Sequence, residues 1–342
     1  MKSEAARPPI EEGGGRASLE RLHRWPRLHL ATLPTPLRRS NRLGVELGAA
    51  NVYLKMDAET GFALGGNKVR KLEFELAPDR LDGVTHLITA GGPQSNHCRV
   101  TAAAAARLGL GCVLVTQAPE PETPRGNALL HRLFGAEMVT VANREDRLGG
   151  MEDVAARIEA QGGHPRVVPV GASTGLGCLG YALAAWELVR QLGALADGCT
   201  GTTLYVSSSS GGTLAGLVLG LALLGRDDVS VVAVSADAPA DELRTTALSL
   251  AAEGAELLAA PPDLASIPLA IDDSQVGDGY GIPTRASTQA LERFARTEGV
   301  VLDPTYTAKA AAGMIAALER KAVLSHRRVV FVHTGGAPGL LA

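Results

Sequence analysis

The sequence predicts an α/β protein with two open, twisted, mostly parallel sheets that are flanked by helices. Short apolar runs alternate with longer helical patterns along most of the 342 residues, which is typical of parallel strands joined by helices. The alternation restarts after Gly171, which indicates two layers of different size. The chain is rich in alanine, has 40 glycines and only 4% aromatic residues, as expected for close-packed helices on glycine-rich turns.

The first layer follows a proline-stiffened entry segment at 33–37. We expect a short strand over 52–55, a glycine-punctuated loop at 61–66 and a helix from 67 to 76. Further strands and helices then alternate in chain order: strand 86–90, helix 96–108, strand 112–115, helix 127–134, strand 137–141 and helix 151–161.

The second layer repeats this strand–helix alternation and predicts further βαβ units. The polar, proline-containing stretch 259–268 is expected to be an excursion between helices. The predicted elements are helix 177–192, strand 203–206, a serine-glycine loop at 207–212, helix 213–224, strand 229–235 and a late strand at 328–333.

Charge and hydropathy limit the partners that we expect. The formal net charge of −3 and the pI near 6.3 give no reason to expect nucleic acid or an anionic membrane as partner, whereas small substrates stay open. No apolar run reaches about 18 residues, so no transmembrane helix is expected. The polar N-terminus lacks the apolar core of a signal peptide, which favours a cytoplasmic location.

The four cysteines give no sign of a metal site. They form no CxxC motif, and their spacings match no zinc pattern. Buried free thiols are therefore favoured over disulfides or metal ligands. The four are Cys98, Cys112, Cys178 and Cys199.

The run Gly65-Gly66-Asn67-Lys68 is the first candidate for chemistry. Paired glycines allow a ligand to approach the backbone closely. Lys68 then falls on the first turn of a helix, where the partial positive charge disfavours an ammonium, and a partly neutral lysine attacks aldehydes. The alternative is a solvated lysine beside Arg70 and Lys71.

The serine-glycine loop at 207–212 is a candidate phosphate site. It follows a strand and opens an apolar helix, so free backbone N–H groups and small hydroxyls would lie together. It matches neither the Walker loop nor the dinucleotide GxGxxG pattern. The alternative is a serine that caps an ordinary helix.

Two further segments carry polar residues at strand ends. Ser95 and Asn96 follow a predicted strand, at the sheet edge where ligands of α/β proteins collect, although either could be a plain helix cap. Near the C-terminus, Tyr306 lies beside a turn proline, which makes it more suggestive than a core tyrosine. His333 at a strand end is expected to be structural rather than a base.

Taken together, these segments resemble the fold type II pyridoxal-phosphate enzymes, and within them the D-cysteine desulfhydrase and 1-aminocyclopropane-1-carboxylate (ACC) deaminase family. The resemblance runs from about Leu33 to the end of the chain. It rests on GGNKVRKLEF, QSNHCR, SSSSGGT, LDPTYTAK and HTGG in that order. It implies a tryptophan-synthase-beta-like homodimer with a large cofactor domain from 26–71 and 177–342 and a small domain from 72–176. From the residues themselves, we expect 1–25 to be a flexible tail that leads into a helix.

The resemblance also implies a role for each matched position. Lys68 would hold pyridoxal 5'-phosphate as a Schiff base, and Lys68, Ser95, Tyr280 and Tyr306 would be catalytic. The other implied contacts are Asn96 on the cofactor's ring hydroxyl, Thr334 on its pyridine nitrogen, Ser209, Ser210, Gly211, Gly212 and Thr213 on its phosphate, and Gln94, Ser95, Asn96 and His97 on the substrate.

The implied reaction is β-elimination from a β-substituted amino acid such as D-cysteine, giving a keto acid and ammonia. Two positions depart from the family pattern. Thr307 stands where ring-opening deaminases carry a glutamate that would keep the pyridine nitrogen protonated, which disfavours ring opening. The run at 55–60 also departs from the usual basic-acidic sequence, so the substrate could differ from D-cysteine.

Three other functions stay open. The first is ACC deamination. The second is β-replacement on an activated serine, although the asparagine loop SGNTG of cysteine synthases is absent and QSNHC takes its place. The third is a non-catalytic protein that binds a phosphate ligand on the same kind of sheet.

Overall fold

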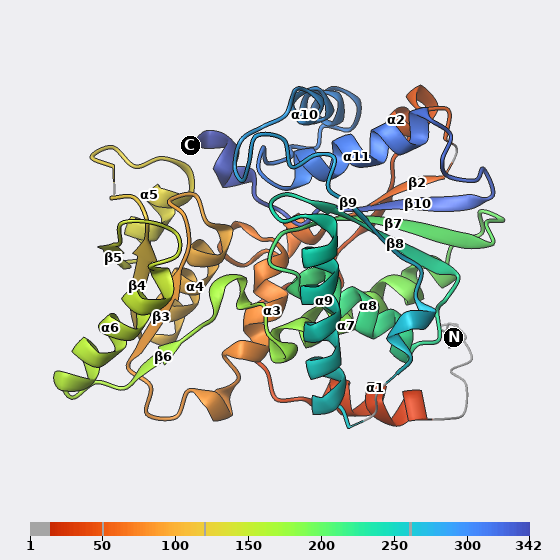
Figure 1. Cartoon of the computed structure of the whole chain (residues 1–342). Coiled ribbons are helices and arrows are strands. Elements are labelled where there is room, and N and C mark those ends of the chain that lie inside the picture. The colour runs from red at the N-terminus through yellow and green to blue at the C-terminus, as the bar shows by residue number, and fades with distance from the viewer. Residues whose placement is uncertain (1–13, 50, 120, 260–261) are drawn as a thin grey trace, which may run out of the picture.

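The computed structural model describes residues 14–49, 51–119, 121–259 and 262–342, which form two sheets with helices on their faces (Figure 1). The larger sheet has the strand order β1-β2-β10-β7-β8-β9, and the smaller sheet has the order β5-β4-β3-β6. All paired strands are parallel except β1, which runs antiparallel to β2. The predicted fold class is confirmed.

The strands of the described chain are β1 Leu37–Arg39, β2 Val52–Lys55, β3 His86–Ala90, β4 Gly111–Thr116, β5 Glu137–Thr140, β6 Pro165–Val167, β7 Gly201–Ser208, β8 Val229–Ser235, β9 Leu269–Asp272 and β10 Arg327–Val332. The α-helices are α1 Gly14–Arg24, α2 Asn41–Glu46, α3 Asn67–Glu75, α4 Asn96–Leu108, α5 Gly126–Leu133, α6 Arg147–Ala160, α7 Gly175–Gly193, α8 Gly212–Leu223, α9 Ala240–Leu257, α10 Arg285–Glu298 and α11 Thr307–Glu319. Short 3-10 helices lie at η1 Asp57–Glu59, η2 Phe62–Leu64, η3 Pro78–Arg80, η4 Val170–Ala172, η5 Leu264–Ser266 and η6 Ala337–Leu341.

Helices cover both faces of the larger sheet. Val330 and Val332 of β10 pack in one core cluster with α7 and α8, whereas Val329 and Phe331 pack in another with α10 and α11. Successive strand residues point to opposite faces, so a strand buried on both faces must be apolar throughout. Although α8 is almost entirely buried, no helix in the described ranges is long and apolar enough to span a membrane.

The smaller sheet is packed in the same way and lies to one side of the larger one (Figure 1). Leu87 and Leu114 pack with residues of α3 and α4, whereas Ile88 and Val113 pack with residues of α6. Helix α3 contacts both α4 and α7. The segment that carries Lys68 is therefore held between the helices of both sheets.

The predicted elements occur with ends shifted by a few residues, and three expectations need correction. The flexible tail expected at 1–25 is wrong over α1, where Leu19 and Leu22 are buried against α7 and α8; residues 1–13 lie outside the described residues. Helix α6 begins at Arg147 rather than 151, because Gly149 and Gly150 lower the helix propensity that sequence reasoning relies on. The described part of 259–268 connects α9 to strand β9, not to another helix.

The contact between α7 and α8 generates a stability prediction. A Cβ atom on Gly216 of α8 would lie 2.1 Å from the Cys178 carbonyl oxygen and 2.4 Å from the Tyr181 Cβ. We expect Gly216→Ala to force the helices apart and to lower the free energy of unfolding by about 1–3 kcal/mol. The measurement is the shift of the thermal and urea midpoints.

Gly149→Ala in α6 is the matched control, because no heavy atom lies within 4 Å of its Cβ position. We expect that variant to gain up to about 1 kcal/mol from helix propensity. Midpoints that move equally in both variants would contradict the close-packing argument.

Candidate active site

A cavity of about 460 Å³ lies at the carboxyl ends of strands from both sheets. Its walls come from segments that follow β3 and β5 to β10, together with the starts of α3 and α9 and the segment before α11. Ligands of open α/β sheets collect at this edge. The cavity brings together most of the predicted site residues: Lys68, Ser95, Asn96, His97, Ser209, Ser210, Gly211, Thr213, Tyr280, Tyr306 and Thr334.

Two predicted residues do not line this cavity. The Gln94 side chain turns away: its Oε1 accepts the Asn127 N–H at 2.8 Å, and its Nε2 donates to the Arg125 carbonyl oxygen. Gly212 begins α8 behind the loop, and a Cβ there would lie 2.8 Å from the Ser173 hydroxyl. The Gln94 side chain therefore points toward Asn127 and Arg125 rather than into the cavity, and Gly212 packs against Ser173.

Lys68 occupies the first turn of α3, as predicted. The Asn67 N–H donates to the Thr334 carbonyl oxygen at 2.9 Å, which ties the helix start to the segment after β10. Burial lowers the pKa of the Lys68 ammonium to about 8, against the opposing effects of its contact with Lys71 and the charge of Asp303. Lys68 is therefore more often neutral and nucleophilic than a solvated lysine.

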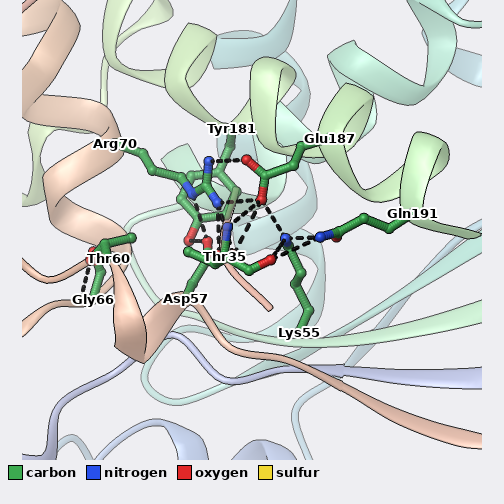
Figure 2. Close-up of polar contacts among 9 residues, drawn as sticks. All are labelled: Thr35, Lys55, Asp57, Thr60, Gly66, Arg70, Tyr181, Glu187 and Gln191. Carbon is green, nitrogen blue, oxygen red and sulfur yellow. Dashed lines mark hydrogen bonds and ion pairs between the residues drawn. The ribbon is translucent and has the colours of Figure 1, made fainter. Parts of the chain in front are cut away.

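A buried cluster of ion pairs, which does not line the cavity, holds α3 in place (Figure 2). The Arg70 guanidinium donates to both oxygens of Asp57 at 2.9 Å and to Oε1 of Glu187 at 3.0 Å. Lys55 donates to the same Glu187 oxygen, and the Tyr181 hydroxyl donates to Asp57 at 2.6 Å. Burial would raise the pKa of the Asp57 carboxyl, but the charges and hydrogen bonds of Arg70, Lys55 and Tyr181 together outweigh burial and keep the pKa below its usual range. Each ionisable side chain of the cluster therefore has a hydrogen-bonding partner within it.

This cluster also explains the unusual run at 55–60. Lys55 and Asp57 belong to the ion cluster, and no residue of the run lines the cavity. The run therefore acts on the helix that carries Lys68. It is not in contact with the space available to a substrate.

The serine-glycine loop lines the same cavity as Lys68 and has the features of an anion cradle. Gly211 has φ of 78°, a left-handed conformation that lets the loop turn into α8 and leaves the first N–H groups of that helix without intrahelical partners. The Ser208 hydroxyl is buried and has no hydrogen-bond partner among the described residues. Ser210 shares a 2.7 Å hydrogen bond with Ser173, to which the buried Lys71 amine donates at 3.1 Å. Hydroxyl and N–H donors thus face one space, as a phosphate requires.

Sequence reasoning treated Lys71 only as a neighbour of Lys68. Burial, and then repulsion by Lys68, lowers the pKa of Lys71 well below its usual value. An anion in the cradle would offset both effects. Only the tertiary contact of α3 with the segment before α7 reveals this position, so no local signal could have found it.

The segment from Ser95 to His97 starts α4. The Ser95 hydroxyl accepts the Cys98 N–H at 3.2 Å, so Ser95 is the helix cap that the plainer interpretation expected, and it also lines the cavity. Oδ1 of Asn96 accepts from Arg99 and from Asn127, which leaves the Asn96 amide nitrogen as a donor.

His97 is held in the wall next to this segment. Its Nε2 lies 2.8 Å from the Thr89 hydroxyl, whereas its buried Nδ1 has no hydrogen-bond partner in the part of the chain that the structure describes. Burial, followed by the Lys68 charge, lowers the pKa of His97 well below its usual value. His97 is therefore neutral near pH 7.

The two tyrosines meet across the cavity. The Tyr280 and Tyr306 hydroxyls are hydrogen-bonded, with ring centroids 5.9 Å apart in an edge-on arrangement. Burial raises the pKa of Tyr306 well above its usual value, so both hydroxyls keep their protons near pH 7. Thr307 follows Tyr306 but does not line the cavity, because its hydroxyl donates to Asp303 at 2.6 Å.

The last strand supplies two more residues. The Thr334 hydroxyl lies 3.0 Å from the Ser207 hydroxyl at the cavity wall. His333 contacts the Val301 carbonyl oxygen at 3.1 Å, and burial lowers its pKa to about 4. His333 is therefore a structural residue, as expected.

Comparison with known proteins decides the family. The family model "Pyridoxal-phosphate dependent enzyme" matches residues 28–335. The chain is 41% identical over 331 residues to D-cysteine desulfhydrase of Salmonella typhi, which covers 95% of this chain and 98% of that protein. A solved structure of an ACC deaminase homologue has a TM-score of 0.85 and 31% identity, over 95% of this chain and 96% of that one.

The chain belongs to the pyridoxal-phosphate dependent enzymes. It is a lyase of the D-cysteine desulfhydrase and ACC deaminase family, and its cofactor is pyridoxal phosphate. A fungal L-serine ammonia-lyase from Rhizomucor miehei shares the fold, with a TM-score of 0.65 and 20% identity over 92% of this chain and 96% of that one.

The cavity fits this cofactor. The unpartnered Ser208 hydroxyl and the free N–H groups of α8 suit a phosphate, and the Lys68 amine lies in the same cavity to meet an aldehyde. The Asn96 amide nitrogen is free to donate to a ring hydroxyl.

The lowered pKa of Lys68 predicts how the apoenzyme takes up its cofactor. Only the neutral amine condenses with an aldehyde, and at pH 7 roughly a tenth of Lys68 is neutral for a pKa of about 8, against about one part in 3000 at the usual 10.5. The rate at which the visible absorption band forms should rise about tenfold per pH unit and level off near pH 8.

Lys68→Ala is the control for this experiment and should form no band, although its circular dichroism stays that of the folded protein. A rate in the unchanged chain that still climbs tenfold per unit between pH 9 and 10 would contradict the lowered pKa.

The buried ion cluster predicts a large stability cost. Arg70→Met leaves Asp57 and Glu187 without their main counter-charge, and we expect unfolding to become easier by about 3–5 kcal/mol. Arg38→Met is the matched control, because its ion pair with Glu59 is exposed and should be worth at most about 1 kcal/mol.

Denaturant midpoints compare the two variants. If Arg70→Met does not accumulate as folded protein, Glu187→Gln is the milder substitute with the same expected direction. Similar midpoints for the buried and the exposed variants would show that the cluster does not anchor α3.

Proposed function

We propose that this lyase catalyses β-elimination from a β-substituted amino acid, with D-cysteine as the first candidate substrate. The observation that carries the proposal is the presence of the Lys68 amine, whose pKa is about 8, in one cavity with an anion cradle. The identity with D-cysteine desulfhydrase supports the choice of substrate. D-cysteine and water would give a three-carbon keto acid, ammonia and hydrogen sulfide, which balances all atoms.

Different residues of this chain would carry out different parts of the reaction. When bound, pyridoxal phosphate supplies an electron sink for the negative charge that forms at the α-carbon. Lys68 accepts the α-proton on Nζ, as a base whose pKa is near the working pH. The start of α4, with Ser95, binds and orients the substrate carboxylate through its free N–H groups. The protonated Tyr280 and Tyr306 hydroxyls donate hydrogen bonds on the side of the leaving group.

The second candidate is ACC deamination, which the structural likeness to an ACC deaminase homologue supports. Ring opening demands more stabilisation of negative charge than loss of a thiol. The position after Tyr306 carries Thr307, whose hydroxyl is occupied by Asp303, so it offers no carboxylate to the cofactor ring. We therefore place ring opening second.

The assembly and setting of the enzyme are part of the same proposal. A homodimer follows from the family resemblance. The two separate sheets support a large domain from 26–71 with 177–342 and a small domain from 72–176. All four cysteines are free, which supports a reducing, cytoplasmic setting.

A substrate panel tests the reaction. We expect keto acid and sulfide from D-cysteine, and little or no keto acid from the cyclopropane amino acid. Ser95→Ala and Tyr306→Phe should keep the visible cofactor band and lose at least about 100-fold in kcat/KM, as is usual when a proton-transfer or orienting group is removed. Full turnover in both variants would remove these residues from the mechanism, and no keto acid from any panel member would overturn β-elimination.

A further inference from the structure

Two arginines line the cavity but have no role in the mechanism above. Arg144 lies in the segment after β5, and Arg147 is the first residue of α6, so both reach the cavity from the smaller sheet. Sequence reasoning gave neither of them a function. The Arg144 side chain is half exposed, whereas Arg147 is buried, where a charge is costly unless it is compensated.

Arg144 spans the cavity. Its guanidinium donates to both oxygens of Asp237 at 2.6 and 3.2 Å, and Asp237 follows β8 of the larger sheet. The Arg144 guanidinium carbon also lies 5.3 Å from the centre of the Tyr280 ring. Arg144 is thereby held beside the tyrosine pair, on the side where we place the leaving group.

Arg147 is the more informative of the two, because none of the carboxylates in the described part of the chain forms an ion pair with it. Arg147 is only 8% exposed. Its guanidinium donates to the Gln117 amide oxygen, and Nε lies 3.1 Å from that oxygen. Within the described ranges it pairs with no carboxylate at ion-pair distance. Burial, and then repulsion by Arg144, lowers the pKa of Arg147. A bound anion would relieve both effects.

The other anions of the proposed reaction already have their own donors. The cofactor phosphate has the cradle at the start of α8, and the substrate carboxylate has the start of α4. The remaining carboxylates of the cavity, Asp237 and Glu242, leave Arg147 unpaired. One anion site is therefore left over, next to the tyrosines.

We propose that Arg144 and Arg147 bind an anionic leaving group on the β-carbon of the substrate, a tetrahedral oxyanion such as a sulfonate or a phosphate ester. This inference rests on the proposed β-elimination and narrows its substrate class. Lys68 takes the α-proton, the bond from the β-carbon to sulfur or oxygen breaks, and its electron pair leaves with the oxyanion. Water then completes the conversion to keto acid and ammonia, with no oxidant or reductant needed. Guanidinium groups suit such an oxyanion because they donate paired hydrogen bonds.

The first experiment measures binding to the holoenzyme by calorimetry, without turnover. The probe is 3-sulfopropanoate, which has a carboxylate and a sulfonate but no amine, and butanoate is the matched probe without the sulfonate. We expect 3-sulfopropanoate to bind at least 10-fold more tightly, and we expect Arg147→Gln and Arg144→Gln to abolish the difference. Equal binding of the two probes by the unchanged enzyme would overturn the proposal.

The second experiment compares leaving groups. Cysteate and O-phosphoserine are the anionic substrates, and D-cysteine and β-chloroalanine are the references, with both stereoisomers of each chiral compound. In Arg147→Gln the ratio of kcat/KM for anionic over neutral leaving groups should fall by about 10- to 100-fold, the effect of losing a hydrogen bond to a charged group. Arg147→Lys should restore part of the ratio. The cysteate and phosphoserine arms decide which oxyanion is preferred.

Arg157→Gln is the matched control, because Arg157 lies on the same helix in an exposed ion pair with Glu137. An equal loss for all substrates in Arg147→Gln would assign Arg147 to the α-carboxylate and overturn the proposal. If the proposed β-elimination itself is wrong, the result is different. No substrate then gives keto acid, while the enzyme still binds 3-sulfopropanoate more tightly than butanoate.

Discussion

The buried contact between Arg70 and two carboxylates, Asp57 and Glu187, is the constraint on which the active site depends. Arg70 lies two residues after Lys68 on the same short helix, so holding Arg70 also fixes the direction of the Lys68 side chain. Glu187 belongs to α7, which packs on the larger sheet. The Arg70 guanidinium thus links the helix that carries the Lys68 amine to the main core. Its planar group donates to several acceptors at once.

A second principle organises the cavity, namely that chain segments meet at the carboxyl edge of parallel strands. Strands β3, β7, β8 and β10 each end in a loop at this edge, and the loops after β3 and β7 lead directly into helices α4 and α8. The starts of those helices offer unpaired N–H groups, which makes two neighbouring positions suited to anions. The fold therefore offers two positions whose backbone N–H groups suit a phosphate and a carboxylate, before any side chain is considered.

Burial then tunes the titrating groups. Lys68 and Lys71 lie close together, and burial lowers the pKa of both amines although Asp303 and Glu75 act in the opposite direction. The same burial raises the pKa of Tyr280 and Tyr306 and keeps His97 neutral. The cavity thus holds a potential base and two hydroxyl donors at one pH, and Arg147 is the group whose charge is left for a ligand.

The sequence by itself determined the α/β class, the order of most strands and helices, and the positions of Lys68 and the serine-glycine loop, because apolar periodicity and glycine-rich turns are local properties. The tertiary structure decided which of these segments meet. It placed Lys71 beside Ser173, put Lys55 and Asp57 into an ion cluster rather than near a substrate, and turned the Gln94 side chain away from the cavity. Arg144 and Arg147 carry no local signal, because their significance depends on Asp237 and Gln117. These two residues follow β8 and β4, and such long-range pairings leave no trace in the spacing of residues along the chain.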